Sequence, residues 1–293
     1  RSIIDKGSEI LERDLMAVLT ELPQEELSLT INAQPAIMTV SLMALEGAKQ
    51  KGFAFDGVAG HSLGEFSALV AAGALSFEDG LKLVYARAMQ ASGMITLEDA
   101  FRLIKARAEA MDESARTTKG TMSAIMKIAP ETVAEVCEKA KNYVSAVNYN
   151  SPVQTVIAGT PEGVAEVSEI FKEMKGRVIP LSVAGAFHSK LMQKASEKFY
   201  ETAKTITFKK PEVKYYSNVT GGELTDFSDM PSLLAKHIVS PVKFTSELMA
   251  MYKDGATKFV EFGAGKTLTG LVKKTLKDVE AFNVENMEGL ANL

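Results

Sequence analysis

The segment Gly60-His61-Ser62-Leu63-Gly64 most constrains what this chain can fold into, because it joins two different hydrophobic patterns. The short apolar run Val58-Ala59 precedes it, and apolar residues follow it at helical spacing as far as Gly73. A strand that turns sharply into a helix through Gly-x-Ser-x-Gly lifts the serine hydroxyl into solvent at the end of the strand. We therefore expect Ser62 to be a nucleophile, with the Leu63 N–H facing the oxyanion that forms during reaction. The alternative is an ordinary tight turn whose serine caps the helix.

A serine nucleophile needs a base within hydrogen-bond reach, and the chain has only three histidines. His188 is the candidate base, because it lies in a glycine-containing loop that follows the last strand of a predicted insert. His61 is next to Ser62, but adjacent side chains in a turn point apart, so we expect it to anchor the turn. His237 ends a predicted helix, where a histidine commonly interacts with the helix dipole.

The order of the predicted elements divides the chain into two parts. Residues 120–188 follow the order β, α, β, β, α, β, which is typical of a ferredoxin-like subdomain. Residues 1–119 and 189–293 alternate helices and strands, which favours an α/β subdomain with a mostly parallel sheet. Near the start, one helix is expected over residues 2–20, and Pro35 is expected to open a second helix.

A duplicated segment follows the serine turn. Residues 73–83 and 93–103 match, and each copy begins with a helix-capping residue, Ser76 or Thr96. Each copy is followed by an arginine in the same register, Arg87 or Arg107. We expect two tandem helices here, and two copies are too few for a repeat fold.

Composition excludes several classes of protein. Hydrophobic residues make up 46% and charged residues 24%, as in an ordinary globular domain, and no run approaches the roughly 18 apolar residues of a membrane span. The net charge of −4 gives no long-range attraction to nucleic acid. Cys137 is the only cysteine, which excludes an internal disulfide and a Cys-rich metal site. We expect no metal, and, because no signal peptide opens the chain, a cytoplasmic location.

Several blocks of residues resemble those of the malonyl-CoA:acyl-carrier-protein transacylase family, and they span nearly the whole chain. The blocks are Gln34-Pro-Ala36, Gly60-His-Ser-Leu-Gly-Glu65, Gly73-Ala-Leu-Ser-Phe-Glu-Asp79, Asn150-Ser-Pro-Val-Gln154, Gly185-Ala-Phe-His-Ser189, Ser217-Asn-Val-Thr-Gly221, Pro241-Val242, Glu261-Phe-Gly-Ala-Gly-Lys266 and Leu268-Thr-Gly-Leu271. The resemblance implies an α/β-hydrolase-like main subdomain that carries the ferredoxin-like insert. It also implies transfer of a malonyl group from coenzyme A, through an ester on serine, to the phosphopantetheine thiol of an acyl carrier protein. Malonyl-CoA is then a substrate, and no cofactor is bound permanently.

The resemblance assigns further site residues. His188 is the base, and a backbone carbonyl near Ser240 orients it. The bulky ring of Phe187 is similar to the malonyl-selective pattern, which leaves no room for a branched acyl group. Asn150 and Gln154 belong to a matching block and are expected to bind substrate.

In the family, one arginine pairs with the free malonyl carboxylate, and the duplication offers two. Spacing from Ser62 favours Arg87, whereas spacing to the downstream Gly120 favours Arg107. We prefer Arg87, because its helix directly follows the helix after the serine turn.

The family begins with a strand and a Gly-Gln-Gly turn that supplies part of the oxyanion hole, and this sequence starts after it, so we expect a fragment. Two other functions stay open. A serine thioesterase or esterase would deliver the acyl group to water, and a buried arginine facing Ser62 would argue against it. An inactive docking module would bind the carrier protein without catalysis.

Overall fold

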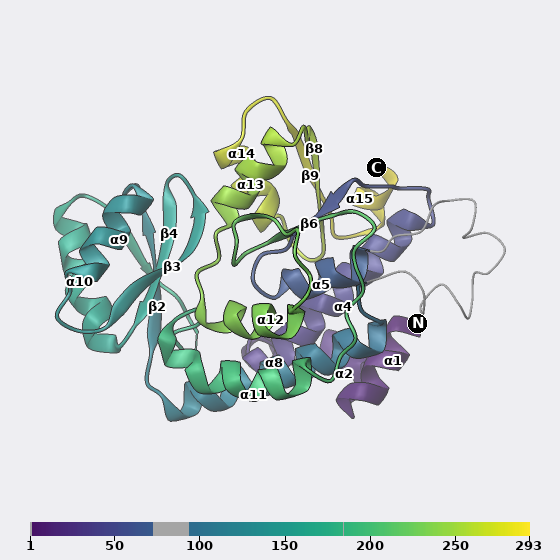
Figure 1. Cartoon of the computed structure of the whole chain (residues 1–293), viewed down its shortest axis with the longest axis horizontal. Coiled ribbons are helices and arrows are strands. Elements are labelled where there is room, and N and C mark those ends of the chain that lie inside the picture. Colours follow the sequence, from purple (N-terminus) through teal and green to yellow (C-terminus); the bar gives the residue numbers. More distant parts are fainter. Residues whose placement is uncertain (1, 73–93, 184) are drawn as a thin grey trace.

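A computed structural model describes residues 2–72, 94–183 and 185–293 (Figure 1). These residues form a helix-rich main part and a smaller part that projects from it, drawn in teal at the left of Figure 1. The first copy of the duplicated segment, with Ser76, and Arg87 lie outside the described residues. In the part of the chain that is described, no helix is both long enough and apolar enough to cross a bilayer.

The N-terminal segment differs from the single helix expected over residues 2–20. It forms two helices, α1 (Ser2–Leu11) and α2 (Leu15–Thr20). Glu12 between them has a left-handed backbone with φ of 54°, and the Asp14 side chain caps the start of α2. The apolar spacing continues across the break, so hydrophobic periodicity alone does not reveal it.

The expectation that Pro35 opens a helix is wrong. After α3 (Gln24–Leu27), helix α4 (Thr30–Lys49) begins before the proline and contains it. Pro35 lies in the second turn of α4 and has no N–H to donate to the Ile31 carbonyl four residues before it, so one helical hydrogen bond is missing. The helix packs against α5 (Gly64–Ala71) and α8 (Leu97–Thr117), so tertiary contacts offset the missing hydrogen bond.

The serine turn has the predicted strand–turn–helix form, between β1 (Gly57–Val58) and α5 (Gly64–Ala71). Strand β1 pairs in parallel with β6 (Lys214–Ser217). Strand β6 also pairs with β7 (Gly222–Glu223) in the antiparallel direction. This small sheet holds the turn in the middle of the main part (Figure 1).

The remaining strands of the main part are β8 (Lys258–Phe262) and β9 (Glu280–Val284), which pair in parallel. Within the described residues they form a sheet separate from that of β1, β6 and β7. The expected mostly parallel sheet is therefore present as two parallel pairs, one of them extended by an antiparallel strand. The other regular elements in the described portion of the main part are helices.

Helix α8 (Leu97–Thr117) begins at the cap predicted for the second copy of the duplication. The Thr96 hydroxyl accepts a hydrogen bond from the Asp99 N–H at 3.0 Å, as an N-cap side chain does. Helix α8 packs against α4, α5 and α11 (Gln193–Ala203), and this places Arg107 in the core.

The smaller part contains one four-stranded antiparallel sheet in the order β3-β4-β2-β5, with two helices. Its elements in chain order are β2 (Thr121–Met126), α9 (Pro130–Glu138), β3 (Val144–Ser151), β4 (Gln154–Gly159), α10 (Pro161–Glu173) and β5 (Arg177–Pro180). The two helices pack against one face of the sheet through Ile125, Ile157 and Phe171. The opposite face, with Val147 and Val156, packs against Ala186 and the residues after it.

Short elements complete the main part: η1 (Lys190–Met192), α12 (Met230–Val239), α13 (Phe244–Lys253), α14 (Thr267–Thr275) and α15 (Met287–Ala291). The segment between α12 and α13 joins the two parts. There the Val242 N–H donates to the Val147 carbonyl at 2.8 Å, and the Tyr149 N–H donates to the Val242 carbonyl at 2.9 Å.

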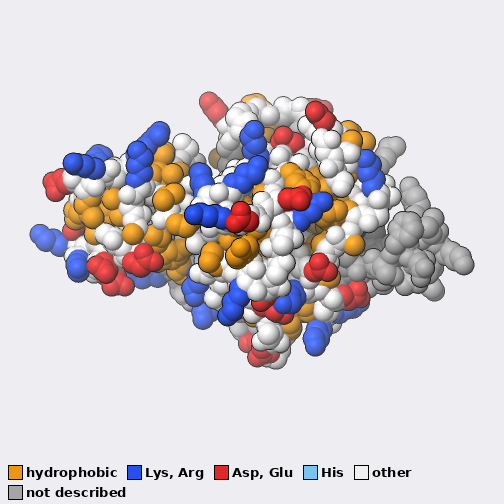
Figure 2. Space-filling model, turned by 90° about the horizontal axis from the view of Figure 1, so that it is seen from above, with side chains coloured by type: hydrophobic (Ala, Val, Ile, Leu, Met, Phe, Trp, Pro, Cys, Tyr) orange, Lys and Arg blue, Asp and Glu red, His pale blue; other side chains and the backbone are white. Residues whose placement is uncertain are grey.

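The surface seen from above carries basic side chains near its middle, beside apolar ones (Figure 2).

Candidate active site

Ser62 lies in the turn between β1 and α5 with φ of 54°, in the left-handed region. That conformation costs a non-glycine residue about 1–2 kcal/mol, so its surroundings must hold it in place. Gly60 allows the chain to approach itself closely, because a Cβ there would lie 2.0 Å from the backbone carbon of Gly64. The Ser62 N–H donates to Asn218 Oδ1 at 2.7 Å. The strained turn presents a partly exposed serine hydroxyl.

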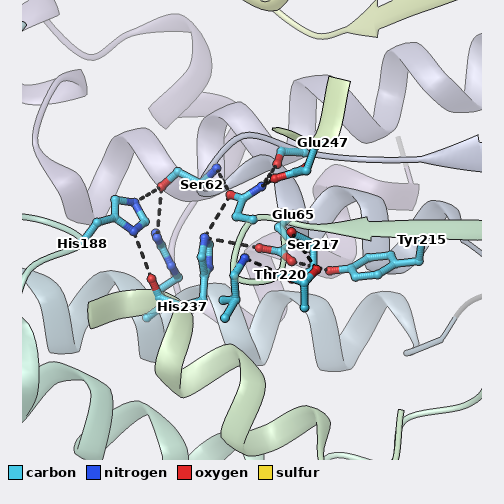
Figure 3. Close-up of polar contacts among 12 residues, drawn as sticks. Ser62, Glu65, His188, Tyr215, Ser217, Thr220, His237 and Glu247 are labelled. Atoms are coloured by element: carbon cyan, nitrogen blue, oxygen red, sulfur yellow. Dashed lines mark hydrogen bonds and ion pairs between the residues drawn. The ribbon is translucent and has the colours of Figure 1, made fainter. Parts of the chain in front are cut away.

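The imidazole of His188 meets this hydroxyl, with Nε2 2.7 Å from Ser62 Oγ (Figure 3). Its Nδ1 lies 3.0 Å from the backbone carbonyl of His237, so the carbonyl expected near Ser240 is instead that of His237. The Ser240 backbone is a second favourable contact. A carbonyl only accepts, so Nδ1 carries the proton and the unprotonated Nε2 faces the serine hydroxyl as an acceptor. Burial, with a contribution from the positive Arg107, lowers the pKa of His188 to about 3.

The His61 side chain contacts the smaller part. Its Nε2 lies 2.7 Å from Asn150 Oδ1 on β3, and its ring packs edge-on against Phe244 at a centroid distance of 5.3 Å. The anchoring role expected for His61 stays a prediction, which this contact supports. Asn150 therefore contacts the serine turn itself.

Arg107 is the arginine that the described structure places at Ser62. The guanidinium is 1% exposed, and Nη2 lies 3.3 Å from Ser62 Oγ. Nη1 donates to Gln34 Oε1 at 2.6 Å, whereas Nε has no hydrogen-bond partner among the described residues. Burial lowers the pKa of Arg107 to about 10, which still leaves it charged at neutral pH. Arg87, preferred from the sequence, lies outside the described residues.

Asn218 is fully buried, and its side chain forms hydrogen bonds with the backbone of the serine turn. Its Nδ2 donates to the Gly60 carbonyl at 2.6 Å and to Glu247 Oε1 at 2.7 Å. Its Oδ1 accepts from the Ser62 N–H and lies 3.1 Å from His237 Nε2. All four hydrogen-bonding positions of this amide are therefore used. Its place in a family-like block was the only sequence signal for it.

Two buried carboxyl groups accompany Asn218, and neither was singled out from the sequence. Glu65 accepts a hydrogen bond from the Tyr215 hydroxyl at 3.0 Å, and Glu65 Oε2 lies 3.3 Å from His237 Nε2 (Figure 3). Burial raises the pKa of Glu65 to about 7 and that of Glu247 well above its usual range. Both side chains come from helices next to the turn, α5 and α13, so only the folded chain brings them together.

The other residues predicted for the site differ in how they lie relative to Ser62 and His188. Within the described residues the Leu63 N–H has no hydrogen-bond acceptor, which leaves it free to meet an oxyanion. Phe187 packs between the core of the main part and the open face of the smaller sheet. Gln154 begins β4, and among the residues described its side chain forms no hydrogen bond with Ser62, His188 or Arg107. Those residues also include no cluster of three or more His, Cys, Asp or Glu side chains able to hold a metal ion.

The α/β fold and the Ser62–His188 pair at a strained strand-to-helix turn define a class of proteins that activate a serine hydroxyl with a histidine base. The acyl transferase domain family model matches residues 8–91 and 86–292, and these two segments overlap within the duplicated region. The chain belongs to the acyl transferase family and, within it, to the malonyl CoA–acyl carrier protein transacylases.

Three known proteins illustrate the relationship. The malonyl CoA–acyl carrier protein transacylase of Bacillus subtilis is 39% identical over 98% of this chain and 86% of its own length. The crystal structure of an acyl-carrier-protein S-malonyltransferase from Burkholderia pseudomallei matches with a TM-score of 0.89 at 32% identity, covering 100% of this chain and 90% of that chain. A structure of a malonyl-transacylase in complex with a type II polyketide-synthase acyl-carrier protein matches with a TM-score of 0.88 at 29% identity, covering 99% and 89%.

Proposed function

We propose that this chain moves a malonyl group from malonyl-CoA to the phosphopantetheine thiol of an acyl carrier protein through an ester on Ser62, as in fatty-acid synthesis. The observation that carries the proposal is Arg107, a buried guanidinium 3.3 Å from Ser62 Oγ. Within the described residues it forms no salt bridge at contact distance, and the buried Glu65 is a carboxyl group that interacts with it electrostatically. A buried cation beside the nucleophile favours an acyl group that brings its own carboxylate. A thioesterase or esterase acting on neutral acyl groups needs no such side chain.

The chemistry follows from the geometry of the pair. His188 Nε2 takes the proton of Ser62 Oγ as the oxygen attacks the thioester carbon, and the Leu63 N–H donates to the oxyanion. The tetrahedral intermediate then expels the CoA sulfur, which takes the proton from His188. In the second half-reaction the carrier thiol attacks the ester while His188 accepts its proton, and Ser62 leaves with that proton. No permanently bound cofactor is needed for either half-reaction.

We also propose how the parts of the chain serve this reaction. Residues 1–119 and 189–293 act as an α/β-hydrolase-like subdomain that carries Ser62 and Arg107, and residues 120–188 act as a ferredoxin-like insert. Phe187 limits the width of the acyl site, and Gln154 lies on the insert side of the substrate path. The likeness to a transacylase solved with its carrier protein supports a carrier protein as partner. The cytoplasm, where carrier protein and malonyl-CoA would meet, is the proposed location.

Mass spectrometry after mixing with malonyl-CoA tests the proposal. We expect a malonyl adduct on Ser62 that disappears when an acyl carrier protein with its phosphopantetheine arm is added. Ser62→Ala should form no adduct, because the attacking oxygen is gone. Rapid release of free malonate without carrier protein would instead support a hydrolase, and the absence of any adduct would support the docking module.

Arg107 is tested by comparing malonyl-CoA with acetyl-CoA, which lacks the free carboxylate. We expect Arg107→Ala to lower the rate of malonyl loading on the order of 10²-fold and acetyl loading by much less, because a charge-assisted pair contributes a few kcal/mol. Arg102→Ala, an exposed arginine on the same helix, is the control. Arg87→Ala is measured beside them. Selective loss of malonyl loading with Arg87→Ala and not with Arg107→Ala would assign the carboxylate to Arg87.

A further inference from the structure

The nucleophile and its base belong to a closed ring of hydrogen bonds that starts and ends at Ser62. Ser62 Oγ meets His188 Nε2 at 2.7 Å, and His188 Nδ1 meets the His237 carbonyl at 3.0 Å. His237 Nε2 in turn meets Asn218 Oδ1 at 3.1 Å, and the same oxygen accepts the Ser62 N–H at 2.7 Å. Four residues from separate segments of the chain thus fix one another's positions (Figure 3).

The donors and acceptors around this ring have only one consistent assignment. Asn218 Oδ1 must be the amide oxygen, because it faces the Ser62 N–H, which can only donate. His237 must therefore carry its proton on Nε2 to donate to that oxygen. His188 carries its proton on Nδ1 and keeps Nε2 free for the serine hydroxyl. Every bond in the ring then has one donor and one acceptor.

His237 takes part in the ring twice, through its backbone and through its side chain. Its carbonyl lies in the last turn of α12, where helical carbonyls lack intrahelical N–H partners and are free to accept from His188. Its imidazole is fully buried, with the ring centroid 5.1 Å from that of His188 and 6.5 Å from that of Phe66. The side-chain bond to Asn218 therefore fixes the carbonyl that orients the base.

We propose that His237 is a positioning residue for acyl transfer, which links the carbonyl that orients His188 to the Asn218 amide that holds the Ser62 turn. This inference rests on the proposed function of the Ser62–His188 pair. Without the side-chain bond, the end of α12 and the serine turn would each be held separately, and the distance between oxygen and base would no longer be fixed. His237 touches no reacting atom, so its effect passes through the other members of the ring.

The variants His237→Gln and His237→Leu distinguish a role of the His237 hydrogen bond from a role of side-chain packing alone. The glutamine side chain has an amide N–H that can donate to Asn218 Oδ1, whereas leucine has no donor. We expect His237→Leu to lower kcat for malonyl transfer to the carrier protein on the order of 10²-fold, with the KM for malonyl-CoA within about two-fold of wild type. His237→Gln should retain at least about one fifth of the wild-type kcat.

Ser196→Ala is the matched control for stability. The Ser196 hydroxyl is buried and donates to the Ala235 carbonyl at 2.6 Å, so it also tethers α12, but it is outside the ring. We expect this variant to lower the melting temperature without a selective loss of kcat. Equal losses of kcat in the Gln and Leu variants, or losses in all three variants that follow the melting temperature, would overturn the proposal. If His237→Leu does not fold, His237→Gln decides alone: a folded variant that falls below one fifth of the wild-type kcat overturns the role.

Formation of the malonyl adduct on wild-type Ser62 distinguishes a failure of this inference from a failure of the proposed function. If the wild type forms no adduct, the proposed function fails and no role in acyl transfer remains for His237. If the wild type forms the adduct and His237→Leu forms it at the same rate, the proposed function stands and the positioning role is wrong.

Discussion

The two residues that meet at the site both adopt a backbone conformation that other residues avoid. Ser62 has φ of 54° and His188 has φ of 60°, in the left-handed region that costs a non-glycine residue about 1–2 kcal/mol. Neither residue is glycine, so the conformation is maintained by their surroundings. For Ser62 these include the Asn218 amide, and for His188 the His237 carbonyl. In these conformations the Ser62 and His188 side chains face each other.

The lowered pKa of His188 predicts how the reaction depends on pH. A general base must be neutral, and a pKa of about 3 keeps the imidazole neutral from pH 8 down to pH 5. We expect the rate of malonyl loading on Ser62 to stay within about two-fold over this range, whereas a base with a pKa of 6.5 would be about 30-fold less active at pH 5. Rapid-quench mass spectrometry of the adduct measures this rate.

The matched variant for this pH profile is Glu65→Gln. The pKa of Glu65 is raised to about 7, so its carboxyl also titrates between pH 5 and pH 8. Any pH dependence that Glu65→Gln removes belongs to that carboxyl. A fall of about 30-fold at pH 5 that persists in Glu65→Gln would mean that His188 keeps an ordinary pKa.

The residues found from the sequence are those whose chemistry shows in a short segment. Ser62 stands in a turn motif, and His188 stands in a loop that returns to the main part. Asn218 and Glu247 were not assigned roles, because an amide or carboxylate acquires such a role only through partners distant in sequence. The choice between Arg87 and Arg107 could not be made from spacing, because the duplication offers the same register twice.

The elements followed local signals where capping or an uninterrupted pattern marks their ends. Helix α8 starts at the predicted Thr96 cap. Short strand β7 and strand β9 were missed, because pairing with β6 and β8 defines them more than their own composition does. The division of the main-part strands into two sheets depends on the same nonlocal pairing.

The two glycines of the serine turn should respond differently to substitution. A Cβ at Gly60 would lie 2.0 Å and 2.2 Å from backbone atoms of Gly64 and Glu65, which cannot move without opening the turn. A Cβ at Gly64 meets nothing within 4 Å, and this residue begins α5. We expect Gly60→Ala to lower the free energy of unfolding by about 3 kcal/mol or more, and Gly64→Ala to change it by no more than about 1 kcal/mol, in the stabilising direction.

Chemical denaturation of the two variants beside wild type measures this difference. Because both substitutions add one methyl group within the same turn, the unfolded states are closely matched. Equal losses of stability would show that the turn adapts to a Cβ at Gly60. In that case the close approach of the backbone at Gly60 would not be what fixes the conformation of Ser62.

In the whole molecule, the site lies where the two parts meet. The serine turn belongs to the main part, His188 follows the last strand of the smaller part, and the segment at Val242 pairs with β3. The bond between His61 and Asn150 is the direct side-chain link from the serine turn to the smaller sheet. The position of the smaller part therefore affects the alignment of the serine turn and the base.

Asn150 allows this coupling to be tested against a role in substrate binding. Asn150→Ala leaves the half-buried His61 imidazole without its partner, which should lower the free energy of unfolding by about 1–3 kcal/mol. We expect kcat for malonyl transfer to fall as well, because the turn loses its link to β3, with little change in KM. Asn142→Ala is the control, because Asn142 is an exposed asparagine of the smaller part that bonds Glu166, and it should change stability by less than about 0.5 kcal/mol. If Asn150 instead contacts malonyl-CoA, Asn150→Ala would raise KM and leave the stability close to that of wild type, and the link between the two parts would not pass through this residue.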